Sequence, residues 1–269
     1  MRRIVPWSIP LIAVLVLAAG CTSTTTTPAP TAVPVAPPPP TVIREAPAPV
    51  RANLRAELAA GYYERGQMDI ALQELAEAIK LDPTNAKIYN VYGLVYATLG
   101  QDALAAQNFR RALELAPNDS EFRQNWGWYL CSHGQAREAI PEFEMALRNP
   151  LYKSPEIALI NAGRCAGSLG ENQRAEAFFK RALSVSPNNP QAAFSLSQLA
   201  YREGRLAEAR ALMKPVMQQT NPAPEALALG VCIERKLGDR SAEASYTSQL
   251  RNRYPDSAEA KNIASGACE

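Results

Sequence analysis

Residues 89–117, YNVYGLVYATLGQDALAAQNFRRALELAP, decide the fold of this chain of 269 residues. Aromatic residues, small residues and one proline stand at fixed positions in the stretch, namely Tyr89, Tyr92, Gly93, Tyr96, Gly100, Ala105, Phe109, Ala112 and Pro117. Similar residues stand 34 positions earlier, namely Leu58, Ala59, Tyr62, Gly66, Ala71, Leu75, Ala78 and Pro83. A repeat of this period indicates a solenoid, in which short structural units stack on one another.

The repeated positions have a physical meaning. Gly93, Ala105 and Ala112 carry little or no side chain, so two helices can cross closely there while aromatic residues fill the space around the crossing. The pattern resembles the tetratricopeptide repeat, a helical hairpin that buries its apolar face only when a neighbour stacks on it. Strong helix formers dominate the same region.

The repeat continues to the end of the chain. Its third copy is two residues longer than the others because of an insertion at residues 149–155, and its sixth copy keeps the order of residues with a one-residue slip. We therefore predict an all-α, right-handed superhelical solenoid of six tetratricopeptide repeats with a C-terminal capping helix. The predicted repeat domain is 52–269, with repeats at 52–85, 86–119, 120–155, 156–189, 190–223 and 224–256 and a cap at 257–269.

The boundaries between copies carry helix stop and start signals. A proline follows the end of one predicted hairpin in three copies, and Asn85, Asp119 or Asn189 comes two residues after it. Asn and Asp are favoured N-caps, so these residues are predicted to begin the next helix.

The first 20 residues are predicted to be a lipoprotein signal. Arg2 and Arg3 precede an apolar run at 11–19, which is too short for a membrane span and ends in small residues before Cys21. The ending resembles a bacterial lipobox, in which the cysteine is acylated and becomes the mature N-terminus, so Cys21 is the predicted lipidation site. Ala18 stands where the lipobox prefers Leu, and a plain secreted form is the alternative.

Residues 21–51 are predicted to tether the repeats to the membrane. The segment is rich in Thr and Pro, with a proline run at 37–40, and such a composition favours extended polyproline conformation over a packed core. Fully extended, it would reach about 90 Å at roughly 3 Å per residue. Thr22 follows the cysteine, and the lipoprotein resemblance implies export to the outer membrane when that residue is not Asp.

The charge balance excludes one class of partner. The net charge is +2, and two of the positive charges, Arg2 and Arg3, belong to the signal. The rest of the chain carries nearly equal numbers of positive and negative charges, and so lacks the excess of positive charge that nucleic-acid binding needs. Attachment to the outer membrane is therefore expected from lipid on Cys21, not from charge.

Four further cysteines are predicted to form disulfides. Cys131 and Cys165 are 34 residues apart, and Cys232 and Cys268 are 36 apart, so each pair falls on neighbouring units. An even number of cysteines in an exported chain favours disulfides, and stacking order excludes contact between units three apart. The alternative is that these cysteines are small buried apolar residues.

No catalytic or cofactor motif was found in the sequence. His133 is the only histidine, and no second ligand pair accompanies it at zinc spacing. The motifs of serine hydrolases and phosphate-binding loops are also absent. We therefore expect a protein that is not an enzyme and that has neither a metal nor a cofactor.

Binding is the expected activity, because solenoids bind along a concave face. In tetratricopeptide repeats the first helix of each unit lines that face, at positions that here predict the groove residues Tyr63, Asn90, Leu94, Trp128, Ile160 and Arg164. Their apolar members suit an apolar peptide or helix. The alternative for Trp128 is a place in the core. Ala56 and Ala60 replace the Lys and Asn of the carboxylate clamp that chaperone-binding repeats use.

Three segments, 125–131, 149–155 and 161–165, resemble the matching parts of the type IV pilus pilotins, the PilF/PilW family. The tail at 244–257 is similar to that family's sixth repeat. The resemblance implies an outer-membrane lipoprotein, monomeric and facing the periplasm, that binds secretin subunits and promotes their localisation and multimerisation. The alternative is a scaffold lipoprotein for cell-wall hydrolases or polysaccharide export.

Overall fold

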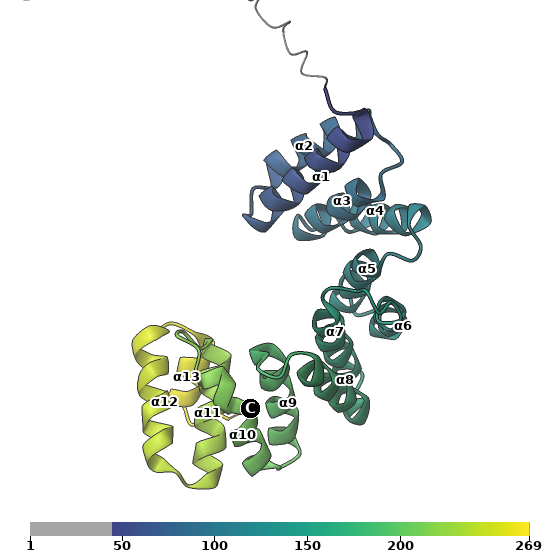
Figure 1. The fold of residues 1–269 in the computed structure, drawn as a ribbon. Coiled ribbons are helices and arrows are strands. Elements are labelled where there is room, and N and C mark those ends of the chain that lie inside the picture. Colours follow the sequence, from purple (N-terminus) through teal and green to yellow (C-terminus); the bar gives the residue numbers. More distant parts are fainter. Residues whose placement is uncertain (1–44, 269) are drawn as a thin grey trace, which may run out of the picture. The chain divides into compact units, whose positions relative to one another are not determined.

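The computed structural model describes residues 45–268. The predicted signal, Cys21 and residues 21–44 of the predicted tether lie outside the described residues. Within 45–268 the chain forms thirteen α-helices and no strand (Figure 1). The helices are α1 Ala48–Glu64, α2 Met68–Leu81, α3 Ala86–Thr98, α4 Asp102–Leu115, α5 Ser120–Ser132, α6 Ala136–Ala146, α7 Pro155–Ser168, α8 Asn172–Val185, α9 Pro190–Arg202, α10 Leu206–Met217, α11 Pro224–Leu237, α12 Arg240–Arg253 and α13 Ala258–Ala264.

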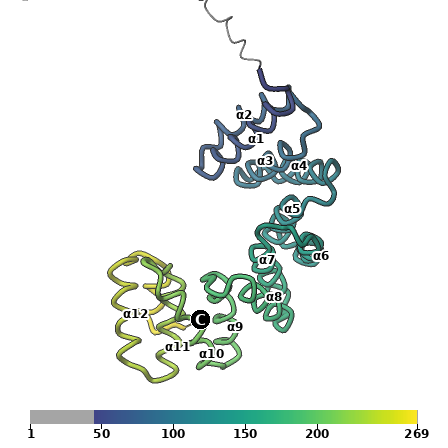
Figure 2. Tube along the Cα trace, in the orientation of Figure 1, coloured from purple at the N-terminus to yellow at the C-terminus, as the bar shows by residue number. Residues whose placement is uncertain are grey.

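Twelve of the helices pair in chain order into six hairpins (Figure 2), and α13 follows the last one (Figure 1). The first helix of each hairpin contacts the first helix of the next, from α1 with α3 to α9 with α11. The second helix of each hairpin also contacts the first helix of the following one. This pattern of neighbour contacts is that of a tetratricopeptide solenoid, which confirms the predicted fold class.

The helices begin, and the turns between them lie, where the sequence predicts. The side chains of Asn85, Asp119 and Asn189 cap α3, α5 and α9 by accepting hydrogen bonds from backbone N–H groups of the first turn. Helix α1 begins at Ala48, before the predicted boundary at 52, because Pro49 in its first turn needs no N–H partner. Each hairpin turns through a glycine with φ between 68° and 80°.

Small and large residues meet where the two helices of a hairpin cross. Gly93 lies against Phe109, Gly127 against Phe143, and Gly163 against Phe179. In the sixth hairpin Gly230 lies against Tyr246 at the same separation in sequence. The slip in this copy therefore leaves the crossing intact and is taken up at Gly238, which itself caps α11 in the left-handed conformation.

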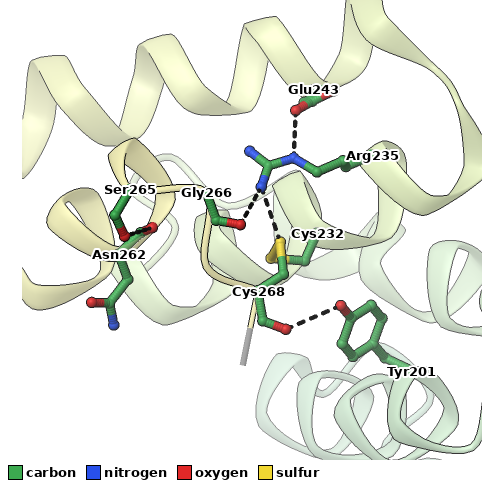
Figure 3. The surroundings of a disulfide bond; sticks show 8 residues. All are labelled: Tyr201, Cys232, Arg235, Glu243, Asn262, Ser265, Gly266 and Cys268. Atoms are coloured by element: carbon green, nitrogen blue, oxygen red, sulfur yellow. Dashed lines mark hydrogen bonds and ion pairs between the residues drawn. A yellow bond between two sulfur atoms is a disulfide. The ribbon is translucent and has the colours of Figure 1, made fainter.

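Two disulfides join neighbouring units, with the pairings that the spacing predicts. Cys131 of α5 bonds to Cys165 of α7, with their Cα atoms 5.9 Å apart. Cys232 of α11 bonds to Cys268, in the tail after α13, with their Cα atoms 5.5 Å apart (Figure 3). Each bond therefore ties the first helix of one unit to the element stacked on it.

Candidate partner-binding groove

A groove of about 810 Å³ lies across the first helices of the N-terminal hairpins. Residues of α1, α3, α5 and the start of α7 line it, together with the insertion before α7. The lining includes Glu57, Ala60, Tyr63, Lys87, Asn90, Leu94, Glu121, Gln124, Asn125, Leu151, Tyr152 and Ile157. The helices place these side chains together because α1 packs on α3 and α3 on α5.

Three of the six predicted groove residues line this groove. Tyr63 and Leu94 are half-buried there, so each offers part of its apolar surface to a partner. Asn90 is only 1% exposed, and its Oδ1 accepts a hydrogen bond of 3.1 Å from Nδ2 of Asn125. The amide pair, of which only Asn90 is fully buried, therefore links α3 to α5 in the lining of the groove.

The other three predicted residues do not line this groove, and only Ile160 is buried too deeply to face a partner. Ile160 is 3% exposed and belongs to the core cluster that also contains Phe143. Trp128 is half-buried and packs against two core clusters while keeping part of its surface exposed. Arg164 is exposed but lines a separate hollow between α7 and α9.

The insertion supplies an apolar residue that sequence reasoning missed. Leu151 is 83% exposed at the edge of the groove, and its backbone N–H donates to Oδ1 of Asn149 at 3.0 Å. Tyr152 beside it packs on the core, and burial raises the pKa of its hydroxyl well above the ordinary value. The extra length of the third repeat was the available signal, because an insertion must project from a stacked array.

The rim of the groove is charged, which corrects the prediction of an apolar surface. Nζ of Lys87 lies 2.9 Å from Oε1 of Glu57, and this ion pair joins α3 to α1. The hydrogen bond from Lys87 holds the pKa of Glu57 below its ordinary value. Apolar patches surrounded by charged and amide groups can hold a peptide by apolar contact and orient it by hydrogen bonds.

His133 has a structural position at the end of α5. Its Nδ1 lies 2.8 Å from the backbone oxygen of Tyr129, and its Nε2 lies 3.0 Å from Oδ1 of Asp102 in the preceding hairpin. Across residues 45–268 no cluster of three or more His, Cys, Asp or Glu side chains could hold a metal ion. No helix in this range is both long and apolar enough to cross a bilayer.

Comparison with known families identifies the repeats. Profiles described as TPR repeat or tetratricopeptide repeat match residues 61–100, 86–119, 125–190 and 168–230. Repeats of this kind form solenoids whose extended surfaces bind other proteins.

Two similar proteins take part in type IV pilus assembly or biogenesis, and both have solved structures. The Type IV pilus assembly protein PilF of Pseudomonas aeruginosa is 27% identical over 203 residues, which are 76% of this chain and 81% of that protein. The crystal structure of PilW, a widely conserved type IV pilus biogenesis factor, is 30% identical with a TM-score of 0.71, covering 79% of this chain and 98% of that one. The structure of Pseudomonas aeruginosa PilF is 25% identical with a TM-score of 0.75, covering 81% of this chain and 99% of that one.

Proposed function

This chain belongs to the PilF and PilW family of type IV pilus tetratricopeptide repeat proteins, and we propose that it acts as a pilotin. In this role it is a lipoprotein of the outer membrane, anchored through acylated Cys21 with its repeats in the periplasm. It binds secretin subunits, brings them to the outer membrane and promotes their multimerisation during pilus biogenesis.

The observation that carries the proposal is the extent of the likeness to PilW. The match covers 98% of that chain at 30% identity, so it includes the whole repeat array and not one hairpin. A generic likeness between repeat proteins would support the fold alone. The role in type IV pilus biogenesis therefore follows from the family, while the secretin partner is our proposal.

The groove offers a surface of suitable chemistry. Tyr63 and Leu94 give it a half-buried apolar floor, and Leu151 adds an exposed apolar residue at its edge. An amphipathic helix or short segment of a secretin subunit can place apolar side chains on these residues. Its polar groups then meet the charged rim around Glu57 and Lys87.

Leu151→Asp is the sharpest test of this surface, because a residue 83% exposed can change without disturbing the core. In cells that rely on this chain, heat-resistant secretin multimers on a gel should fall at least about tenfold, as expected when an apolar anchor is replaced by a charge. The matched control is Val185→Asp, which changes an exposed apolar residue of α8 outside the groove and should leave the multimers at the wild-type level.

A second variant, Leu94→Asp, tests the half-buried floor, with circular dichroism to report whether the solenoid remains helical. A folded and membrane-anchored Leu151→Asp chain that still supports full secretin assembly would show that this groove is not the working surface. Recovery of cell-wall hydrolases or polysaccharide-export proteins, without secretin, in a pull-down from envelopes would favour the scaffold alternative.

A further inference from the structure

A second hollow, of about 240 Å³, lies between α7 and α9 in the C-terminal half of the array. Two guanidinium groups line it, those of Arg164 on α7 and Arg202 on α9. Its other polar residues are neutral and include Ser168, Asn172, Ser195 and Gln198, and no carboxylate is part of the lining. The hollow therefore combines two positive charges with neutral hydrogen-bonding groups.

Neither guanidinium has a hydrogen-bonded or ionic partner among residues 45–268. The nearest acidic residues along the chain are already paired with other arginines. Glu171 lies 3.1 Å from Nη1 of Arg174, and Glu203 lies 2.7 Å from Nη2 of Arg205. Glu171 and Glu203 are therefore engaged elsewhere, and the lining of this hollow holds no carboxylate to balance Arg164 and Arg202.

The surface continues from this hollow toward the end of the array. Phe194, Gln198 and Arg202 stand one helical turn apart on α9, and all three also line a neighbouring hollow of about 470 Å³. That second hollow lies among α9, α11 and α13 and adds the apolar residues Leu229 and Ile263. One face of α9 therefore connects a positively charged hollow to one that is lined by both apolar and polar residues.

The second hollow also carries two acidic residues, Glu225 and Glu259. They would repel a carboxylate placed at that end, whereas Arg164, which lines only the first hollow, and Arg202, which lines both, would attract it to the first hollow. Cys232 of α11 and Cys268 of the tail, which are joined by a disulfide, form part of the wall, and the Tyr201 hydroxyl donates to the backbone oxygen of Cys268 at 3.3 Å (Figure 3). The two ends of the surface therefore differ in charge, so a charged segment would bind in one orientation.

We propose that this face, from α7 across α9 to α11 and α13, binds an acidic peptide segment of a partner protein. The segment places a carboxylate between Arg164 and Arg202 and an adjacent apolar side chain against Phe194, Leu229 and Ile263. Arginine suits the first contact because its planar guanidinium binds carboxylates through two parallel hydrogen bonds. The site is separate from the N-terminal groove and would allow two partner segments to be held at once.

The test uses the full-length chain and a short synthetic peptide in which two aspartates precede a leucine and a phenylalanine. A second peptide carries asparagines in place of the aspartates. By fluorescence anisotropy, the acidic peptide should bind, and the double variant Arg164→Gln with Arg202→Gln should weaken binding by about tenfold or more, because charged hydrogen bonds are lost. Added salt should also weaken binding to the wild-type chain.

Arg181→Gln is the matched control, because Arg181 is an exposed arginine of α8 that lines neither hollow. This variant and Leu151→Asp should both bind the acidic peptide like the wild type, and circular dichroism should show that the double variant is folded. The proposal is overturned if the wild-type chain does not bind the peptide, if the asparagine peptide binds equally well, or if the double variant binds unchanged. Arginine-dependent binding to anionic phospholipid vesicles in place of the peptide would also overturn it in favour of a lipid site.

Discussion

The Cα of Gly163 lies so close to the ring of Phe179 that a β-carbon at position 163 would be 2.5 Å from Cε1 of that ring. No carbon–carbon contact of this length is tolerated in a packed interior. The crossing of α7 and α8 therefore depends on the absence of a side chain on one helix and the presence of a ring on the other.

Gly163→Ala should destabilise the protein by about 1 to 3 kcal/mol, because the added methyl group must displace a buried ring. Gly167→Ala on the same helix is the matched control, since its β-carbon would meet only the Ala175 β-carbon at 3.9 Å. That control should be neutral or stabilising by up to about 1 kcal/mol, because Ala favours helix over Gly. Urea denaturation followed by circular dichroism measures both, and equal midpoints would show that the crossing is not tightly packed.

The disulfide between Cys131 and Cys165 should stabilise the middle of the array. Replacing both residues by Ser should lower the free energy of unfolding by about 2 to 4 kcal/mol, mainly because the unfolded chain regains freedom. Mass spectrometry of alkylated protein should find the two cysteines linked. Free thiols at both positions in freshly isolated periplasmic protein would contradict the prediction.

Cys268→Ser should loosen the end of the array while leaving the middle unchanged. The tail is held on α11 by the disulfide and by Arg235, whose Nη1 donates to the backbone oxygen of Gly266 at 3.1 Å. Without the disulfide, hydrogen exchange should become faster in α13, a helix of seven residues, and stay unchanged in α5. Unchanged protection of α13 would mean that packing alone holds the cap.

Cys21→Ser should abolish outer-membrane attachment. Lipid on this cysteine is the proposed anchor, and the nearly balanced charge of the chain offers no substitute. Fractionation of envelopes should find the variant as a soluble or inner-membrane precursor. A Ser variant that still fractionates with the outer membrane would refute the predicted lipidation site.

Asp239 should make stability depend on pH at the acid end. A hydrogen bond from the backbone N–H of Ala242, and then one from Arg210, hold the pKa of this capping carboxylate below its ordinary value of 3.8. Because the folded pKa is the lower one, the ionised carboxylate stabilises the fold above pH 3.8, and this contribution is lost as pH falls through the folded pKa.

Asp239→Asn should therefore lower the melting temperature at neutral pH, and the difference from wild type should shrink as the pH falls below 3.8. Asp256→Asn is the control, because Asp256 is an exposed aspartate between α12 and α13 that caps no helix. A difference that stays constant with pH would assign the effect of Asp239→Asn to changed cap geometry and not to charge.

The repeat period predicted the hairpins, the capping residues and both cysteine pairings, because these depend on spacing within and between adjacent units. Asn85, for example, caps α3 because its Oδ1 accepts a hydrogen bond from the backbone N–H of Lys87, two residues later. The interpretation of the sixth copy missed Tyr246, which stands where three other copies have Phe, because a tyrosine can also be a surface residue.

The groove was predicted less well, because a position in a repeat does not determine burial. Ile160 occupies a groove position by count, but it is buried in the core cluster against which the inserted Tyr152 packs. Leu151 and Arg202 were not among the predicted groove residues. Leu151 lies in the inserted loop, and Arg202 lies on α9, where it lines a hollow together with residues of the preceding unit. Such contributions cannot be found from positions within one repeat.

The disulfide-bonded tail affects whether copies of the protein associate end to end at high concentration. In a stacked array each hairpin has a surface on which the next hairpin packs. If the last hairpin left that surface exposed, another copy of the protein could pack on it, end to end. Here α13 packs on α11 and α12, and Cys268 is covalently fixed to α11. The helix α13 and the disulfide-bonded tail thus cover the last stacking surface. We expect a chain without them to polymerise into filaments.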